Sequence, residues 1–294
     1  MKQITFIACI TSIFSILANP LTAQNFDSVQ IKTYKITETV YMLEGDGGNI
    51  GVLVGNDGTV LIDDQFAPLS EKIKTALKAI TGKAVRFVIN THFHNDHVGG
   101  NENFGKEGAV IVAQDNSRLR MTTNQLMKAF GTEQKASPYD ALPKITFTES
   151  VTLYLNGETL QVIHIKNAHT DGDAIIYFKE SNVIHTGDVF VRYGLPFIDQ
   201  PHGGSIDGMI KGIEDILAVG NDDTKIIPGH GAIATKKDVL DYKKMLQTVR
   251  DRIADGIKQG KTLNEIIALN PTKEYTAGFD RSAFISLVYD SMKK

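Results

Sequence analysis

The segment Thr91–Gly100, with the sequence THFHNDHVGG, carries the densest group of chemically active side chains in the chain. Three of the eight histidines and one aspartate lie within six positions, from His92 to His97. Neutral imidazoles and a carboxylate are ligands that suit a divalent ion such as zinc. The alternative, a polar loop with surface histidines, does not explain this clustering. The segment therefore predicts a metal site.

A buried strand must position this segment. The preceding run, Ala84–Ile89, is apolar and β-branched, which is typical of a buried strand. Side chains alternate along an extended chain, so His92 and His94 should point to one side, with Asp96 following. The segment itself is expected to be a loop that leaves the strand end, where α/β sheets usually carry their chemistry.

Three later segments also place a histidine or aspartate on a glycine-bearing loop just after a predicted strand. They are 167–173 with His169, 184–188 with Asp188, and 228–231 with His230. A site at one edge of a sheet sandwich would collect its ligands from such loops.

In this order, the four segments resemble the metallo-β-lactamase superfamily, from the first hairpin to the long helix after His230. The resemblance implies an α/β fold, a four-layer αβ/βα sandwich with a two-metal site in the groove between the sheets. It implies a first metal held by His92, His94 and His169, a second held by Asp96, His97 and His230, and Asp188 bridging both. The expected cofactor is two zinc ions, with iron or manganese as alternatives.

The chemistry agrees with this implied ligand set. Three protein ligands leave a position open for water, which is the catalytic pattern rather than the structural one. A bound metal lowers the pKa of that water to about 7. We expect a metal-bridging hydroxide to attack a carbonyl carbon, with Asp96 as the catalytic residue that orients it. His92→Ala or Asp96→Ala should then abolish hydrolysis.

The resemblance does not set the substrate, because the superfamily hydrolyses β-lactams, thioesters, lactones and phosphodiesters. The best-known β-lactamases place a cysteine where Asp188 stands, and Asp188 instead is similar to glyoxalase-II-like hydrolases. The export signal and the run Asp96–Asn101 resemble exported β-lactamase-like enzymes. We therefore rank first a hydrolase of a cyclic amide or ester, such as a β-lactam in antibiotic catabolism. A thioester or carboxylic-ester hydrolase is the alternative.

Other classes stay open beside a hydrolase. An iron oxidoreductase of the same fold is one, and a non-catalytic metal-binding module is another. Five histidines and two aspartates with open positions argue against a closed structural site. A net charge of -3 and the lack of a basic tract argue against nucleic-acid and membrane-surface partners. The expected partner is a small-molecule substrate, and these features specify no oligomeric state.

Residues 1–23 are predicted to be an export signal. Lys2 begins it, the apolar run Ile4–Leu17 follows, and Ala23 is a small residue at the expected cleavage point. The run is short for a membrane span, so we expect cleavage, export to the periplasm and no stable span. Cys9, the only cysteine, lies inside this segment, and lipid attachment there is the alternative.

Residues 24–294 are expected to form one domain, with C-terminal helices from about residue 236. Strands and helices alternate twice, and each half begins with hairpins, so helices should cover both sheets. Helices are predicted at Leu69–Ile80 with Ser70 as cap, Asp115–Phe130, Ser205–Val219, Lys236–Lys258, Leu263–Leu269 and Ser282–Met292. Asn156-Gly157 is the strongest hairpin signal.

Substrate contacts are predicted from three loops, Asp46–Asn49, Gly131–Leu142 and Arg192–Ser205. Arg192 could pair with a substrate carboxylate, but we favour the alternative that it is a solvated surface arginine. Three further side chains near strand ends have supporting roles. Asp63 is a candidate hydrogen-bond partner for a ligand histidine, with a plain turn carboxylate as the alternative, and His164 and His185 are expected to pack or to form hydrogen bonds.

Overall fold

The computed structural model describes residues 25–276 and 278–293. The predicted export signal, with Cys9, lies outside the described residues. Within them, no helix combines the length and the apolar character that crossing a bilayer requires.

The first half of the chain forms a seven-stranded mixed sheet. In spatial order its strands are β1 (Lys32–Lys35), β2 (Val40–Glu44), β3 (Ile50–Leu53), β4 (Thr59–Ile62), β5 (Val85–Ile89), β6 (Val110–Gln114) and β9 (Ile145–Phe147). The strands from β4 to β9 in this order pair in parallel. Their carboxyl ends therefore meet at one edge of the sheet, and the segment Thr91–Gly100 leaves β5 at that edge.

The second half forms a five-stranded sheet. Its strands are β10 (Ser150–Leu155), β11 (Glu158–Ile165), β12 (Asp173–Phe178), β13 (Val183–His185) and β14 (Lys225–Ile227). Asn156 and Gly157 join β10 to β11 with φ angles of 54° and 79°. Positive φ at both positions is what a tight hairpin turn requires, so the predicted hairpin is confirmed.

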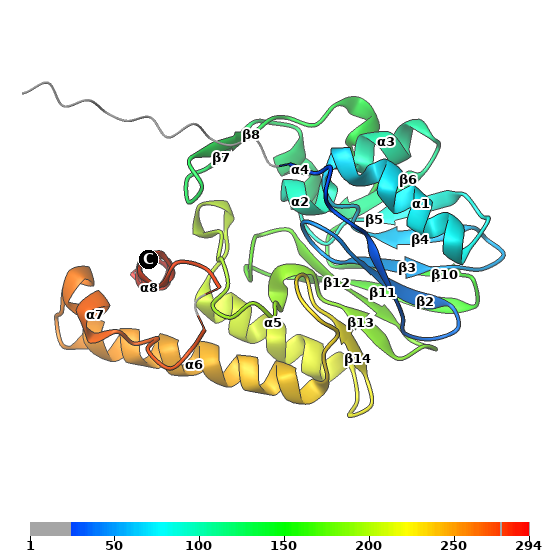
Figure 1. Cartoon of the computed structure of the whole chain (residues 1–294). Coiled ribbons are helices and arrows are strands. Elements are labelled where there is room, and N and C mark those ends of the chain that lie inside the picture. Colours follow the sequence, from blue (N-terminus) through cyan, green and yellow to red (C-terminus); the bar gives the residue numbers. More distant parts are fainter. Residues whose placement is uncertain (1–24, 277, 294) are drawn as a thin grey trace, which may run out of the picture.

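Helices cover the outer face of each sheet (Figure 1). On the first sheet lie α1 (Ser70–Ile80) and α3 (Asn101–Lys106), and on the second lie α5 (Ile206–Val219) and α6 (Lys236–Lys258). Alternation along β4 builds two cores, because Leu61 packs with α1 while Val60 and Ile62 face the other sheet. Along β12, Ile175 packs toward α5 in the same way, and Ile176 faces the first sheet. The four-layer αβ/βα sandwich is thus confirmed.

The C-terminal helices α7 (Leu263–Leu269) and α8 (Arg281–Ser291) pack beside α6 (Figure 1). Short 3-10 turns lie at Ala67–Leu69, Tyr139–Ala141, Gly187–Val189 and Gln200–His202. The 3-10 turn Ala67–Leu69 explains why the cap of α1 is not the predicted Ser70. Leu69 takes the cap position, and Ser70 is the first residue of the helix rather than its cap.

The helix predicted over Asp115–Phe130 is wrong in its second half. The helix α4 spans only Asp115–Met121, and a separate two-stranded hairpin follows, β7 (Gln125–Met127) with β8 (Thr132–Gln134). The Gln125 side chain donates to the carbonyls of Arg120 and Thr123, which closes the helix end. The hairpin that replaces the helix lies over the edge of the sandwich where the histidines gather.

Candidate metal centre

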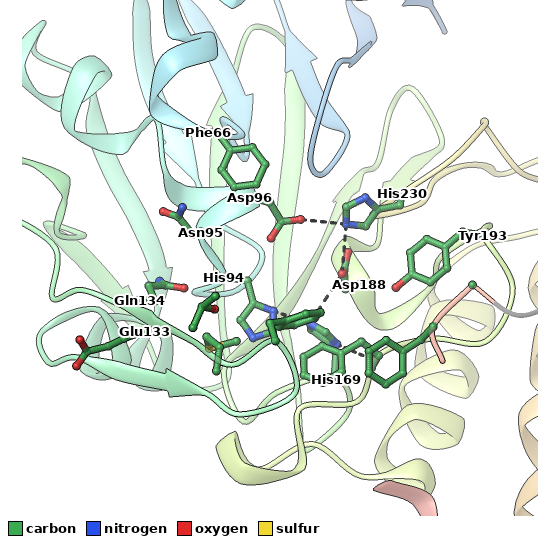
Figure 2. Close-up of a pocket in the computed structure, with 16 residues that line it drawn as sticks. Phe66, His94, Asn95, Asp96, Glu133, Gln134, His169, Asp188, Tyr193 and His230 are labelled. Carbon is green, nitrogen blue, oxygen red and sulfur yellow. Dashed lines mark hydrogen bonds and ion pairs between the residues drawn. The ribbon is translucent and has the colours of Figure 1, made fainter. Parts of the chain in front are cut away.

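The seven side chains predicted as ligands lie together at one edge of the sandwich. Figure 2 shows His94, Asp96, His169, Asp188 and His230 around one space. Three groups have donor atoms within 4.8 Å of one another: His92, His94 and His169; His92, His97 and Asp188; and Asp96, His97 and His230. The segment expected to be all loop contains one helical turn, α2 (Asn95–Val98), which brings Asp96 and His97 to the centre.

In the first group, hydrogen bonds on the outer side of each ring fix its orientation. The outer contacts are His92 Nδ1 with Thr91 Oγ1 at 3.0 Å, His94 Nε2 with Asp199 Oδ2 at 2.8 Å, and His169 Nδ1 with the Phe197 carbonyl at 2.9 Å. Each outer nitrogen that donates leaves the inner nitrogen of its ring with a lone pair.

The inner nitrogens of the first group face one another. His94 Nδ1 forms a hydrogen bond with His169 Nε2 at 2.9 Å, and buried His92 Nε2 has no hydrogen-bond partner. Burial lowers the pKa of His169 to about 4, aided by His94, and holds the pKa of His92 well below its usual range. Three imidazoles that converge on one point fit a divalent cation.

Carboxylates enter with Asp96, His97 and His230, which we call the second group; His92, His94 and His169 are the first group, and Asp188 lies close to both. His97 Nε2 lies 3.3 Å from both His230 Nε2 and Asp188 Oδ1, and Asp96 Oδ2 lies 3.3 Å from His230 Nε2. Burial opposes charge on the two rings, but Asp188 and Asp96 outweigh it and raise the pKa of His97 well above its usual range. They also raise the pKa of His230, to about 10. Without metal, protons therefore neutralise this group, and a cation must displace them.

Asp188 lies between the two groups. Its Oδ2 is 3.4 Å from His230 Nε2 and 3.8 Å from His169 Nε2. Burial alone would raise the pKa of Asp188, but His230 and His97 hold it well below its usual range. A buried, ionised carboxylate that reaches both groups has the geometry that bridging two cations requires.

Asp63 connects the two groups from behind, as predicted for a partner of a ligand histidine. It accepts hydrogen bonds from His97 Nδ1 at 2.7 Å, from Thr91 N at 2.8 Å and from Thr91 Oγ1 at 2.7 Å. Thr91 Oγ1 in turn contacts His92 Nδ1. These hydrogen bonds let the single carboxylate of Asp63 hold His97 directly and His92 through Thr91.

The hairpin tip Asp46–Asn49 supports the centre and does not line the cavity. Asn49 Nδ2 donates to the carbonyls of Pro228 and Gly231, at 2.9 and 2.7 Å, which anchors the loop of His230 on both sides. Gly48 lies against the imidazole of His97, so a Cβ there would come within 2.6 Å of both ring nitrogens. The substrate contact predicted for this tip is therefore not seen in the described lining of the cavity. Instead, Gly48 packs against His97, and Asn49 anchors the loop of His230.

Gly48→Ala should lower the unfolding free energy by about 1–3 kcal/mol, because the added methyl overpacks a buried ring that cannot move freely. It should also weaken metal binding by displacing His97. Urea unfolding and zinc titration would measure both effects. Gly82→Ala is the matched control, since nothing lies within 4 Å of its Cβ position. Equal stability and zinc affinity in the two variants would contradict the close packing.

A cavity of about 660 Å³ opens beside the centre (Figure 2). Its walls are mostly apolar and aromatic, and its lining includes Phe66, Met127, Phe130, Tyr193, Phe197 and Phe279. Two predicted loops contribute to it, Gly131–Leu142 through residues 132–134 and Arg192–Ser205 through Tyr193 and Phe197. Phe66, Met127, Phe130 and Phe279 were not predicted. Burial raises the pKa of Tyr193 above its usual range, so its phenol stays a neutral donor.

Two side chains of the loop Arg192–Ser205 have roles other than substrate contact. Arg192 turns away from the cavity, donates to the Ile233 carbonyl at 2.8 Å and pairs with Asp238 at 3.1 Å. The proposed contact of Arg192 with a substrate carboxylate is therefore wrong. His202 is buried and contacts Asp199 at 2.7 Å, so it holds the carboxylate that holds His94.

His164 and His185 form hydrogen bonds outside the centre, as predicted. His164 Nε2 contacts the Asp171 carbonyl at 3.1 Å. His185 Nε2 donates to the Asn49 carbonyl at 3.1 Å, and its Nδ1 accepts from Gly187 N at 3.2 Å. The second contact needs a ring without a proton on Nδ1, and burial lowers the pKa of His185 to about 4.

His185 should make the metal-free protein less stable in acid. An unfolded histidine titrates near pH 6.5, so its stabilising contribution is complete above that pH and is lost as the pH falls toward about 4. Between pH 7 and pH 5, the wild type should lose about 2 kcal/mol more than His185→Gln, which cannot titrate. Urea unfolding in EDTA at both pH values measures this. Parallel losses in the two proteins would show that His185 is not the titrating group.

Comparisons with known proteins agree with this site and fold. Residues 43–230 match the sequence profile of the metallo-β-lactamase superfamily, and the chain belongs to that superfamily. An alkyl/aryl-sulfatase of Saccharomyces cerevisiae is 38% identical over 80 residues, which cover 26% of this chain and 12% of the yeast protein. This match therefore spans only a small part of that relative.

Solved structures share the fold. A metallo-β-lactamase from Pontibacter korlensis superposes with a TM-score of 0.61 at 18% identity, covering 74% of this chain and 99% of that one. A stereoselective inverting sec-alkylsulfatase from Pseudomonas sp. superposes with a TM-score of 0.69 at 17% identity, covering 88% of this chain and 50% of that one. The chain is thus a member of the metallo-β-lactamase superfamily by its sequence profile, with the fold of these structures and a His/Asp cluster suited to two metal ions.

Proposed function

We propose that the protein is a zinc-dependent hydrolase of a neutral carboxylic ester, linear or cyclic. The observation that carries this proposal is the convergence of seven donor side chains beside a cavity with mostly apolar walls. Two bound divalent cations would supply a water-derived nucleophile at neutral pH and would polarise the bond under attack. Iron or manganese could bind the same types of ligand.

In this proposal the seven side chains would hold two cations. His92, His94 and His169 would hold the first, and Asp96, His97 and His230 would hold the second. Asp188, which groups with His92 and His97, would be a ligand shared between the two cations. Asp96 would also orient the water-derived nucleophile. Burial alone would raise the pKa of Asp96, but His97 and His230 lower it to about 2, so its carboxylate is ionised at neutral pH. Tyr193 offers its neutral O–H to a substrate oxygen at the cavity wall.

The described lining offers no lysine or arginine to pair with a carboxylate of the substrate. Apart from the histidines, its charged side chains are Asp96 and Asp188, whose charge the two cations would offset, and Glu133, which is acidic. A β-lactam antibiotic carries a carboxylate, and a glutathione thioester carries two. Neither finds a lysine or arginine among the described lining residues. We therefore place carboxylic esters above β-lactams and thioesters.

A second candidate is hydrolysis of an alkyl sulfate ester. The yeast and Pseudomonas proteins to which this chain is similar are sulfatases by name. The leaving alcohol of an alkyl sulfate would suit the same apolar walls. No lysine or arginine of the described lining would pair with its anionic sulfate group, which counts against this candidate.

A substrate panel on the zinc-reconstituted protein tests the proposal. We expect turnover of p-nitrophenyl butyrate and of a lactone, loss of that turnover in EDTA, and recovery on adding zinc. Nitrocefin, S-lactoylglutathione and an alkyl sulfate should be turned over more slowly. Faster sulfate release would establish the second candidate, and faster nitrocefin opening would restore the β-lactam assignment. Ester turnover that persists without metal would overturn the proposal.

We also propose that the enzyme acts after export to the periplasm. Lys2, the apolar run Ile4–Leu17 and Ala23 support this. Intact-mass measurement of the exported protein should show a chain beginning near Gln24. A mass that includes residues 1–23 would overturn the cleavage.

A further inference from the structure

Three phenylalanines from distant parts of the chain form one wall of the cavity. Phe130 lies in the turn of the β7–β8 hairpin, Phe197 in the loop after β13, and Phe279 just before α8. The ring centroids are 5.0 Å apart for Phe130 and Phe197, 5.2 Å for Phe197 and Phe279, and 6.2 Å for Phe130 and Phe279. We call these three rings the aromatic wall.

The aromatic wall contacts the metal centre at Phe197 and is exposed to solvent at Phe130. The carbonyl of Phe197 holds His169 Nδ1 at 2.9 Å, and the Phe197 ring lies 5.8 Å from that of His169. Phe130, in contrast, is 54% exposed. A ring of that size gains free energy when an apolar group covers it. The wall therefore offers an apolar surface that starts beside the reacting atoms and leads outward.

A second cavity, of about 370 Å³, lies behind the aromatic wall. Phe197 and Phe279 line both cavities, so their rings form the partition between them. On its far side the second cavity is bounded by Lys128 and Ala129 of the hairpin and by Ala283 and Leu287 of α8. Removing the ring of Phe279 would open the first cavity into the second.

We propose that the enzyme selects esters with an unbranched aliphatic acyl chain, which lies along the aromatic wall, and that Phe279 sets the longest chain accepted. The inference rests on the proposed ester hydrolysis. The acyl carbon lies at the metal centre, and the chain lies along the rings of Phe197 and Phe130. In the wild type the end of the chain meets the ring of Phe279, which closes the way into the second cavity. Each methylene that leaves water for this wall raises kcat/KM by up to about fourfold.

A series of p-nitrophenyl esters, from acetate through butyrate and octanoate to laurate, tests this with the zinc-reconstituted protein. The value of kcat/KM should rise at least about tenfold from acetate to octanoate, because several methylenes become buried. It should fall again at laurate. Phe130→Ala should reduce the octanoate-to-acetate ratio of kcat/KM. Phe279→Ala should move the optimum to laurate.

Tyr154→Ala is the matched control, since this aromatic ring is 78% exposed on β10, outside the cavity lining. Phe279→Leu, which keeps an apolar side chain, covers the case in which the alanine variant does not fold. It should shift the optimum in the same direction by a smaller amount. A flat chain-length profile in the wild type, or an optimum unmoved by both Phe279 variants, would overturn the inference. Absence of metal-dependent turnover for every ester would instead overturn the proposed function.

Discussion

His92→Ala should lower kcat/KM by at least about 10³-fold, because a cation loses a ligand and several kcal/mol of charge stabilisation go with it. The effect should match that of His97→Ala and exceed that of the other ligand histidines. His92 and His97 are the two histidines that each belong to two candidate groups. Steady-state kinetics and metal content per chain would measure the loss.

Stability measurements separate this effect from unfolding. Zinc should raise the melting temperature of the wild type much more than that of His92→Ala, because ligand binding stabilises the folded state by mass action. Without metal the two proteins should differ less, since His92 Nε2 has no hydrogen-bond partner to lose. His164→Ala is the control, a histidine whose contact is with the Asp171 carbonyl outside the centre. If His92→Ala bound two zinc ions and kept full activity, the ligand assignment would be wrong.

The ligand positions could be predicted from sequence because each follows a strand that its composition reveals. The carboxyl ends of β4, β5 and β6 meet at one edge, and the loops after β11, β13 and β14 reach the same edge. The pattern of strands and turns predicted that His92, His169, Asp188 and His230 each lie on a loop at a strand end. The resemblance to the superfamily implied that these residues hold a shared pair of metals.

The residues that surround the ligands could not be predicted in the same way. Asp199 holds His94 across 105 positions of sequence, and no local pattern distinguishes it from other loop aspartates. Phe279 reaches the cavity only because α8 packs on α6. Met127 and Phe130 were assigned to a helix, since their apolar spacing continues that of α4. The helix end depends on side-chain hydrogen bonds of Gln125, which hydrophobic periodicity does not reveal.

Asp63→Asn should weaken zinc binding about 10–100-fold, although Asp63 belongs to none of the three candidate ligand groups. The Asp63 carboxylate accepts hydrogen bonds from Thr91 N, Thr91 Oγ1 and His97 Nδ1, so replacing either of its oxygens removes the acceptor of at least one buried donor. An asparagine turns an N–H toward at least one of these buried donors. The unfolding free energy of the metal-free protein should also fall, by about 1–3 kcal/mol.

Comparing Asp63→Ala with Asp63→Asn separates the contribution of the side chain at this position from that of the backbone conformation. Asp63 has a φ of 63°, a left-handed conformation that asparagine tolerates well. Alanine there should cost about 1–2 kcal/mol more than asparagine through the backbone alone. Chelator competition would report zinc affinity, and urea unfolding in EDTA would report stability. Unchanged zinc affinity in Asp63→Asn would contradict the positioning role.

The two zinc affinities should fall together in Asp63→Asn. Asp63 contacts His97 directly, and it holds His92 through Thr91 Oγ1, so one carboxylate orients a ligand of each group. Thr91→Val, which keeps the backbone donor and the side-chain shape, removes only the link to His92. It should weaken the first zinc site and spare the second, and a uniform loss in both variants would show that the two groups are not positioned separately.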